Sequence, residues 1–314
     1  MGANLESVIV TGGAGFLGSH LVKKLLDNDY RVVVLDNLST SSIDNLSFAL
    51  DNPNFEFIDH DVNIKYFRKT KYIFNLACPA SPVHYQKDAI KTIKTNIFGT
   101  INALECARES GAIILQASTS EVYGDPLVHP QRETYWGNVN PIGVRACYDE
   151  GKRTAETLFF DYYRTYHLPI KVVRIFNTYG PNMSIYDGRV VSNFIVQALK
   201  NEPLQIYGDG TQTRSFCYVD DTIDAMFDFI QTPKGYTGPV NIGNPTEHSV
   251  SEIAEIIISL TNSKSTIKYQ ELPQDDPHRR KPEISKINEL TNWEPIVPLR
   301  EGLVKTIEYF KQKV

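Results

Sequence analysis

Short runs of apolar, mostly β-branched residues alternate with longer helical patterns through the first half of the chain. The apolar runs at 7–11, 31–35, 55–58, 72–76, 112–117 and 170–174 predict strands, and the stretches 15–26, 92–110 and 149–167 predict helices. This alternation favours an α/β fold with a doubly wound parallel sheet and helices on both faces. Within 92–110, Ile93, Ile97, Ile101 and Leu104 share one helical face, which we expect to pack on the sheet.

The rhythm changes after Phe176, where residues 177–181 form a turn-rich break and Gly and Pro recur more often. Helical patterns alternate there with short strands and cover residues 187–200, 250–261 and 299–312. We expect residues 220–230 to belong to the first domain. We therefore predict a first domain of residues 1–176 plus roughly 215–240, and a smaller C-terminal α/β substrate domain of 177–214 and 241–314.

Composition narrows the classes of partner. Of the 314 residues, 41% are hydrophobic and 22% charged, and the formal net charge is −5 without any long Lys/Arg block, which argues against nucleic acid. No apolar run approaches the roughly 20 residues that span a bilayer, and no apolar leader segment precedes the first strand. The four cysteines form no CxxC pair, and no His/Cys/Asp cluster has metal-ligand spacing. We expect a soluble cytoplasmic protein that contacts no membrane and holds no metal.

A glycine-rich turn separates the first predicted strand from the first helix. Gly12, Gly15 and Gly18 have the spacing of a dinucleotide-binding loop, in which the backbone approaches a pyrophosphate at a helix N-terminus. Asp36 ends the second strand, where a carboxylate binds the adenosine ribose and repels a 2′-phosphate, so NAD is favoured over NADP. Asp61 follows the third strand, within reach of the adenine. We assign the following residues to a Rossmann-type cofactor site: Gly12, Gly15, Phe16, Leu17, Gly18, Asp36, Asn37, Asp61, Val62, Leu76 and Lys152.

Tyr148 and Lys152 lie four residues apart, on one face of a predicted helix. A phenol with a pKa near 10 is a poor base, and a nearby ammonium favours the phenolate. The segment 117–124, which contains Thr119 and Glu121, precedes this pair at the end of a predicted strand. The combination predicts a site for proton abstraction beside a nicotinamide.

In this order and spacing the motifs resemble the extended short-chain dehydrogenase/reductase family, over essentially the whole chain. The segments 77–82, 129–131, 135–143, 187–194, 279–282 and 293–295 resemble the UDP-glucuronate decarboxylases (UDP-xylose synthases) within it. The resemblance implies that Tyr148 removes the C4 hydroxyl proton, assisted by Thr119, while hydride passes to NAD. Glu121 and Arg280 then assist loss of CO2 and protonation at C5, and hydride returns to give UDP-xylose. Bacterial relatives omit that return, so release of the keto sugar stays open.

The resemblance also implies where the nucleotide end of the substrate binds. Asn177, Arg189 and Arg214 match positions that contact the UDP portion, and Tyr207 is a candidate for the uracil or ribose. Relatives commonly form homodimers by pairing the helices equivalent to 92–110 and 149–167. Residues 39–42, Ser-Thr-Ser-Ser, depart from the family pattern, because relatives often carry glycine and a basic residue there against the adenosine phosphate. In this chain hydroxyl groups can donate the hydrogen bonds instead.

Three other functions remain open. A nucleotide-sugar 4,6-dehydratase usually has an Asp before the Glu, and this chain has Ser120 there, which counts against elimination. A UDP-glucuronate 4-epimerase acts on the same substrate without needing an acid at Glu121. A non-catalytic NAD-binding module typically loses the tyrosine or lysine, and this chain keeps both Tyr148 and Lys152.

Overall fold

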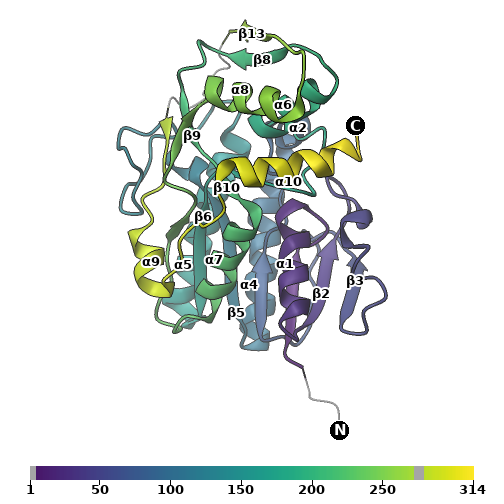
Figure 1. Ribbon diagram of the computed structural model, residues 1–314. Coiled ribbons are helices and arrows are strands. Elements are labelled where there is room, and N and C mark those ends of the chain that lie inside the picture. Colours follow the sequence, from purple (N-terminus) through teal and green to yellow (C-terminus); the bar gives the residue numbers. More distant parts are fainter. Residues whose placement is uncertain (1–4, 272–278) are drawn as a thin grey trace.

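A seven-stranded parallel sheet forms the centre of the computed structural model, which describes residues 5–271 and 279–314 (Figure 1). Its spatial order is β3 (Phe55–Asp59), β2 (Arg31–Asp36), β1 (Ser7–Thr11), β4 (Tyr72–Asn75), β5 (Ile113–Thr119), β6 (Ile170–Ile175) and β11 (Val240–Ile242). All six pairings are parallel. The order reverses between β1 and β4, and such a switch point places a ligand crevice at the carboxyl ends of the strands. The predicted doubly wound fold is confirmed.

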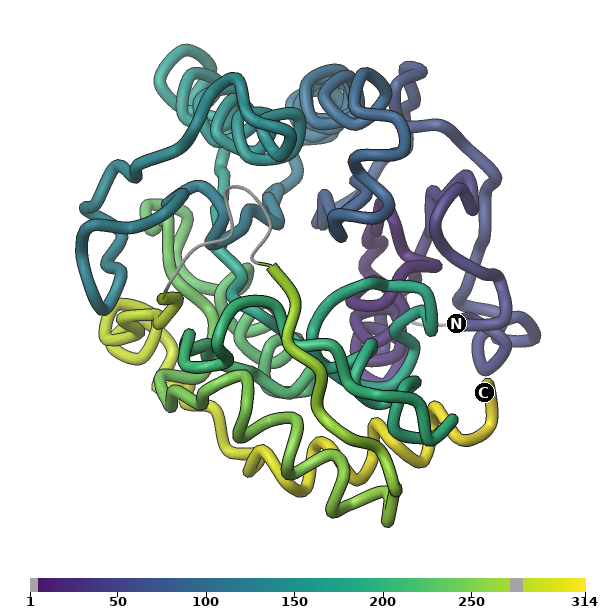
Figure 2. The backbone as a smooth tube through the Cα atoms, turned by 90° about the horizontal axis from the view of Figure 1, so that it is seen from above, coloured from purple at the N-terminus to yellow at the C-terminus, as the bar shows by residue number. Residues whose placement is uncertain are grey.

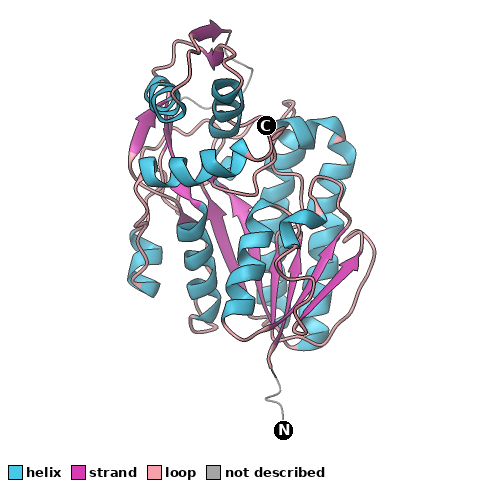
Figure 3. Cartoon of the chain, turned by 45° about the vertical axis from the view of Figure 1, so that its right-hand side comes forward, coloured by secondary structure: helices cyan, strands magenta, loops and turns pink. Residues whose placement is uncertain are grey.

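Helices cover both faces of this sheet, and alternate residues of each strand face opposite layers (Figure 3). Val8 and Val10 of β1 lie in one buried cluster with residues of α1 (Phe16–Asp27) and α7 (Val219–Gln231). Ile9 lies in the other cluster, with residues of α4 (Thr100–Ser110) and α5 (Ala146–Tyr166). Burial on both faces explains why the strands read as continuous apolar runs in the sequence.

The predicted helix 92–110 is present as three consecutive segments: α3 (Ala89–Lys94), a π-helical turn (Thr95–Gly99) and α4. Its buried face differs from the prediction. Leu104 is fully buried under the sheet, but Ile93, Ile97 and Ile101 are only partly buried and lie outside that cluster. Small and hydrogen-bonded residues face inward instead, because α5 approaches closely: a Cβ on Gly151 would lie 2.8 Å from the Asn96 side chain.

A smaller layer lies above the carboxyl ends of the strands (Figure 1), and in the view from above its green and yellow segments lie toward one side of the molecule (Figure 2). It contains β8 (Leu204–Tyr207) paired with β13 (Ile267–Gln270), β9 (Thr213–Ser215) between β12 (Glu247–Ser249) and β14 (Arg279–Arg280), β7 (Thr178–Tyr179) paired with β10 (Cys217–Tyr218), and the helices α6 (Val190–Leu199), α8 (Val250–Thr261) and α10 (Leu299–Lys311). Pairing with β6 places β11 in the large sheet, and α9 (Ser285–Thr291) packs on α7 and β11. The domain boundaries given above stay a prediction.

Within the described ranges, none of the helices combines the length and the apolar character that crossing a bilayer requires.

Candidate active site

One large cleft, with a volume of about 1250 Å³, lies between the carboxyl ends of the central strands and the smaller layer. Residues from both parts of the chain line it. Every residue that the sequence assigned to a site is among them: Gly12, Gly15, Phe16, Leu17, Gly18, Asp36, Asn37, Asp61, Val62, Leu76, Thr119, Glu121, Tyr148, Lys152, Asn177, Arg189, Tyr207, Arg214 and Arg280. The structure thus brings all of them into one cleft.

The glycine turn is shaped by close backbone packing. Gly12 has φ +72°, and a Cβ on it would lie 2.9 Å from the Ala77 backbone; a Cβ on Gly18 would lie 2.1 Å from the Gly12 carbonyl oxygen. Gly15 is the N-cap of α1 without any side-chain cap, and the first turn carries no acidic residue. The N-terminus of α1 therefore presents uncapped N–H groups and a partial positive charge, which suit a pyrophosphate.

Asp36 sits across the glycine turn at the end of β2. Its Oδ2 accepts a hydrogen bond from the backbone N–H of Ala14 (3.0 Å), and Oδ1 accepts from the N–H of Leu38 (2.9 Å) and from Oγ of Ser41 (3.0 Å). These donors fix the carboxylate at the cleft edge, and the serine-rich segment 39–42 supplies one of them. A carboxylate held in this place suits ribose hydroxyls and opposes a phosphate.

Asp61 is held at the same end of the cleft as Asp36. Burial raises its pKa, but hydrogen bonds from the Asn63 backbone and side chain (3.0 and 2.8 Å) and the Lys91 ammonium at 3.7 Å outweigh burial, so the pKa lies below its usual range. Asp61 is consequently an ionised acceptor, which fits a contact with an exocyclic amine.

Tyr148 and Lys152 project from consecutive turns of α5 toward the end of β5. Lys152 is 4% exposed, donates from Nζ to the carbonyl oxygen of Ala117 (2.9 Å), and lies 5.7 Å from the centroid of the Tyr148 ring. Thr119 makes a side-chain hydrogen bond with Tyr148, and its hydroxyl also accepts from the N–H of Glu121 (3.2 Å). The phenol, the ammonium and the threonine hydroxyl therefore meet, as the sequence predicted.

The electrostatics of Tyr148 differ from the expectation. Burial is the largest influence and raises the pKa of the phenol, as do Cys78 and Glu121, whereas the hydrogen bond with Thr119 lowers it. Burial also lowers the pKa of Lys152. In the protein alone, the desolvation of a buried phenolate outweighs the favourable interactions, so the expected lowering of the Tyr148 pKa was wrong.

Glu121, in the short helix η3 (Ser120–Tyr123), is clamped by two arginines. Arg145 donates to its Oε2 at 2.6 Å, and Arg280 of β14 donates to its Oε1 at 3.2 Å and to Oγ of Ser120 at 2.9 Å. Burial raises the pKa of Glu121, but Arg280 and Arg145 outweigh that effect and lower it to about 2. The carboxylate is ionised at neutral pH and lies beside Thr119, and Arg145, which holds it, lies one helical turn before Tyr148.

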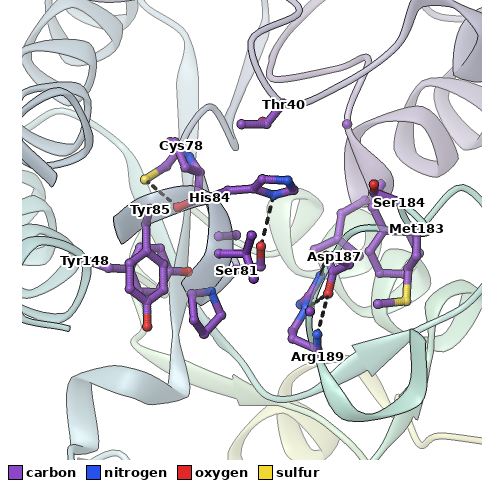
Figure 4. A pocket seen from close by; sticks show the side chains of 18 of the residues that line it. Thr40, Cys78, Ser81, His84, Tyr85, Tyr148, Met183, Ser184, Asp187 and Arg189 are labelled. Carbon is purple, nitrogen blue, oxygen red and sulfur yellow. Dashed lines mark hydrogen bonds and ion pairs between the residues drawn. The ribbon is translucent and has the colours of Figure 1, made fainter. Parts of the chain in front are cut away.

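The residues predicted for the UDP portion line the same cleft and include residues of the smaller layer. Arg189 precedes α6 and forms a two-pronged ion pair with Asp187, with Nε–Oδ1 and Nη2–Oδ2 distances of 2.5 and 2.8 Å. Arg214 on β9 is in register with Arg280 on β14, and Tyr207 ends β8 with 44% of its surface exposed. Figure 4 shows Arg189 and Asp187 across the pocket from Tyr148.

The sequence matches the NAD dependent epimerase/dehydratase family over residues 8–243. The chain belongs to this family. Among its relatives, UDP-glucuronic acid decarboxylase 6 of Arabidopsis thaliana is 55% identical over 308 residues, which are 98% of this chain and 89% of the relative. UDP-glucuronic acid decarboxylase 1 of Danio rerio is 50% identical over 309 residues, covering 98% and 73% respectively.

Solved structures of family members have the same fold. The UDP-glucuronic acid 4-epimerase of Bacillus cereus, in complex with UDP-glucuronic acid and NAD, is similar with a TM-score of 0.90 at 29% identity, over 98% of this chain and all (100%) of that one. The UDP-glucose 4-epimerase of Thermotoga maritima, with UDP-glucose, gives 0.89 at 30% identity, over 98% and 99%. The cofactor of this family is NAD, and the uncapped α1 N-terminus and fixed Asp36 carboxylate fit it.

The structure adds neighbours that the motifs of the family did not reveal. Tyr85 of α2 (Pro82–Lys87) stacks on Tyr148, with ring centroids 5.0 Å apart and planes 3° from parallel (Figure 4). His84 projects into the pocket, and its Nδ1 shares a hydrogen bond of 2.9 Å with Oγ of Ser81 (Figure 4). Arg145, which holds Glu121, could have been found from the sequence, because it lies one helical turn before Tyr148. Nothing in the local sequence marks Tyr85 or His84.

The described residues contain no cluster of three or more His, Cys, Asp or Glu side chains arranged to hold a metal.

Proposed function

We propose that this family member removes CO2 from UDP-glucuronate and forms UDP-xylose through a 4-keto intermediate. One observation carries the proposal. The ionised Glu121 is held between Arg145 and Arg280 and lies in the cleft with Thr119 and Tyr148, the groups that would receive the reacting end of the sugar. The decarboxylases at 50–55% identity are the relatives that support this choice of reaction.

Oxidation at C4 is the first step. When bound, NAD would supply a hydride acceptor for C4 that later gives the hydride back, and a positive charge on its nicotinamide beside Tyr148. Tyr148 takes the C4 hydroxyl proton, Thr119 orients that hydroxyl, and Lys152 holds the nicotinamide ribose. The phenol becomes an effective base because a cation in the closed cleft offsets the desolvation of the phenolate.

Loss of CO2 follows from the ketone. The 4-keto sugar acid is a β-keto acid, so the electron pair of the C5–carboxylate bond moves into the C4 carbonyl as an enolate. The cluster of Glu121 and Arg280 lies beside Tyr148, and we assign it the positioning of the sugar carboxylate and the handling of the proton that C5 receives. Return of hydride to C4 and of the Tyr148 proton to the C4 oxygen gives UDP-xylose.

The rest of the cleft holds the two nucleotides. We assign the UDP portion to Asn177, Arg189, Arg214 and Tyr207, since arginine guanidinium groups bind diphosphate oxygens in pairs. Gly15, Phe16 and Leu17, at the uncapped N-terminus of α1, would hold the cofactor pyrophosphate. The remaining contacts to the cofactor are those of Gly12, Gly18, Asp36, Asn37, Asp61, Val62, Leu76 and Lys152.

Mass spectrometry of the nucleotide products tests the proposal directly. With UDP-glucuronate and NAD we expect a product lighter by CO2, and no accumulation of NADH. Stoichiometric NADH with CO2 loss would mean that the keto sugar leaves before it is reduced. An isomer of unchanged mass would favour the 4-epimerase, which the solved structure with UDP-glucuronic acid makes the second candidate. Water loss from a nucleotide-linked glucose would favour the dehydratase. The presence of Ser120, where dehydratases usually have an Asp, counts against that outcome.

We also propose a homodimer built on α3, α4 and α5. Large apolar side chains are exposed on this side of the fold, including Phe98 at 50%, Ile90 at 69% and Tyr166 at 53%. Covering them by a second copy would remove apolar area from water. Light scattering after gel filtration should give twice the mass of one chain, and Phe98→Glu with Tyr166→Glu should give the single mass. A cytoplasmic location stays a prediction.

A further inference from the structure

Asp149 is a buried carboxylic acid beside the reacting groups, and the reaction steps above do not use it. It is 6% exposed, directly follows Tyr148 on α5, and its Oδ1 has no hydrogen-bond partner among the described residues. Its backbone N–H donates to the carbonyl oxygen of Arg145 (3.1 Å), the residue whose guanidinium holds Glu121. A buried polar atom without a partner costs free energy, so its retention here calls for a function.

The proposed reaction needs a proton that none of the groups already assigned supplies. A sugar carboxylate plus one proton gives the decarboxylated sugar plus CO2, so each turnover consumes one proton at C5. Tyr148 takes a proton from the C4 oxygen and gives it back, which leaves no net proton for C5. Glu121 is ionised by its two arginines, and Lys152 donates to the Ala117 carbonyl oxygen.

We propose that Asp149 stores the proton that replaces CO2 at C5, and that this proton reaches the cleft through the Glu121 carboxylate. This inference rests on the proposed function and deepens it. Glu121 lines the cleft, whereas Asp149 is buried outside the lining and is connected to Glu121 through Arg145, so Asp149 acts through Glu121 and is a positioning residue for the proton.

The charges around Asp149 agree with a stored proton. Burial is the largest influence, and the facing charge of Glu121 is the next; together they raise the pKa of Asp149 to about 8, although Arg145 and Arg280 act in the opposite direction. The other titratable groups that face it are Glu150 and Cys147 on its own helix and Tyr85 on α2. Two carboxylates in one site cannot both ionise freely, so the pair carries a single proton at neutral pH, on Asp149.

The C5–CO2 bond breaks and leaves its electron pair in the enolate; the C5–H bond then forms with this pair as the proton leaves Glu121. Glu121 takes that proton from the Asp149 O–H in the same step, so Glu121 is ionised before and after the transfer, and the Asp149 carboxylate is protonated again from solvent after the product forms. No oxidant or reductant enters beyond the hydride that NAD accepts and returns.

The test compares Asp149→Asn with Glu150→Gln, a matched carboxyl-to-amide change on the neighbouring residue, which pairs with Arg153 (3.5 Å) outside the cleft. Asparagine keeps the size and the neutral charge of the protonated acid, so NAD binding should persist. We expect UDP-xylose formation in Asp149→Asn to fall about 100-fold, the usual size of a lost acid–base group. The wild type and Glu150→Gln should lose kcat above about pH 8, and Asp149→Asn should lack that alkaline limb.

A second readout uses the wild type alone, so it does not depend on folding of a variant. Above about pH 8 the stored proton is lost, so C5 protonation slows, and bound NADH should accumulate in the steady state together with the sugar at the stage before C5 protonation, the decarboxylated enolate. A wild-type kcat that does not fall at high pH would overturn the inference, and so would an Asp149→Asn enzyme that is as active as wild type or uniformly slower with the alkaline limb intact. Failure of the proposed function looks different, because no UDP-xylose would then form at any pH.

Discussion

The guanidinium of Arg174 on β6 donates two hydrogen bonds to the carboxylate of Glu156 on α5, from Nε to Oε1 (3.0 Å) and from Nη2 to Oε2 (2.7 Å). Both side chains are 11% exposed, and Oε1 of Glu156 also accepts from Oγ of Ser118 (2.5 Å), the residue before Thr119. This pair therefore ties the helix that carries Tyr148 to the two strands beneath it. It fixes the separation of Thr119 and Tyr148 without touching the cleft.

Removing this pair should cost stability. Arg174→Met leaves the Glu156 carboxylate buried without its partner, and breaking one side of a buried ion pair costs about 3–5 kcal/mol in the free energy of unfolding. Urea denaturation measures the loss. The matched control is Arg164→Met, which removes an ion pair to Asp161 between side chains that are 61% and 55% exposed and should cost less than about 1 kcal/mol. Equal losses in both variants would contradict the structural role of the buried pair.

Tyr148→Phe should abolish turnover and leave NAD binding intact. The substitution removes the hydroxyl that bonds to Thr119 but keeps the ring that stacks on Tyr85. Product formation is measured by mass spectrometry and NAD binding by calorimetry. A Phe variant that still forms UDP-xylose at a wild-type rate would remove Tyr148 from the role of the base.

Tyr85 should act as a support for Tyr148 through its ring. Tyr85→Leu removes the stacked partner, and we expect kcat to fall about tenfold with a smaller change in KM, because the phenol is less well fixed. Tyr85→Phe keeps the ring and removes an Oη that has no hydrogen-bond partner among the described residues, so it should restore most of kcat. The kcat and KM values of the two variants, measured together, decide whether the ring or the hydroxyl matters.

Asp36 should select NAD. Its carboxylate is fixed by three donors at the ribose end of the cleft, where a 2′-phosphate would meet a negative charge. Titration calorimetry should show affinity for NAD at least tenfold higher than for NADP in the wild type. Asp36→Ser removes the charge and should narrow that ratio, and comparable wild-type affinities for both cofactors would contradict the assignment.

Glu121 should link stability to acid pH. Its folded pKa of about 2 lies below the ordinary 4.5, so its contribution is fully present above about pH 4.5 and is lost as pH falls toward 2. A shift of this size corresponds to about 3 kcal/mol. Unfolding free energies measured from neutral to acid pH should therefore decline less steeply in Glu121→Gln than in the wild type. Parallel curves would show that the ion pairs with Arg145 and Arg280 do not contribute.

The sequence by itself determined the sheet, the glycine turn and the pairing of Tyr148 with Lys152. Each of these depends on local spacing: apolar runs buried on both faces, three glycines at fixed intervals, and residues four apart on one helix. The arrangement of Thr119 and Glu121 followed for the same reason, since they end a strand whose carboxyl edge is the ligand edge of the fold.

Tertiary structure alone decided the contacts between distant segments and the charges they set. Arg280 reaches Glu121 across 159 positions of the chain, and Tyr85 meets Tyr148 across a loop that no periodicity predicts. The same holds for the inward face of residues 92–110, which is set by the close approach of Gly151. The pKa of a side chain depends on burial and on every neighbouring charge, so only the folded chain shows that burial raises the pKa of Tyr148 and of Asp149.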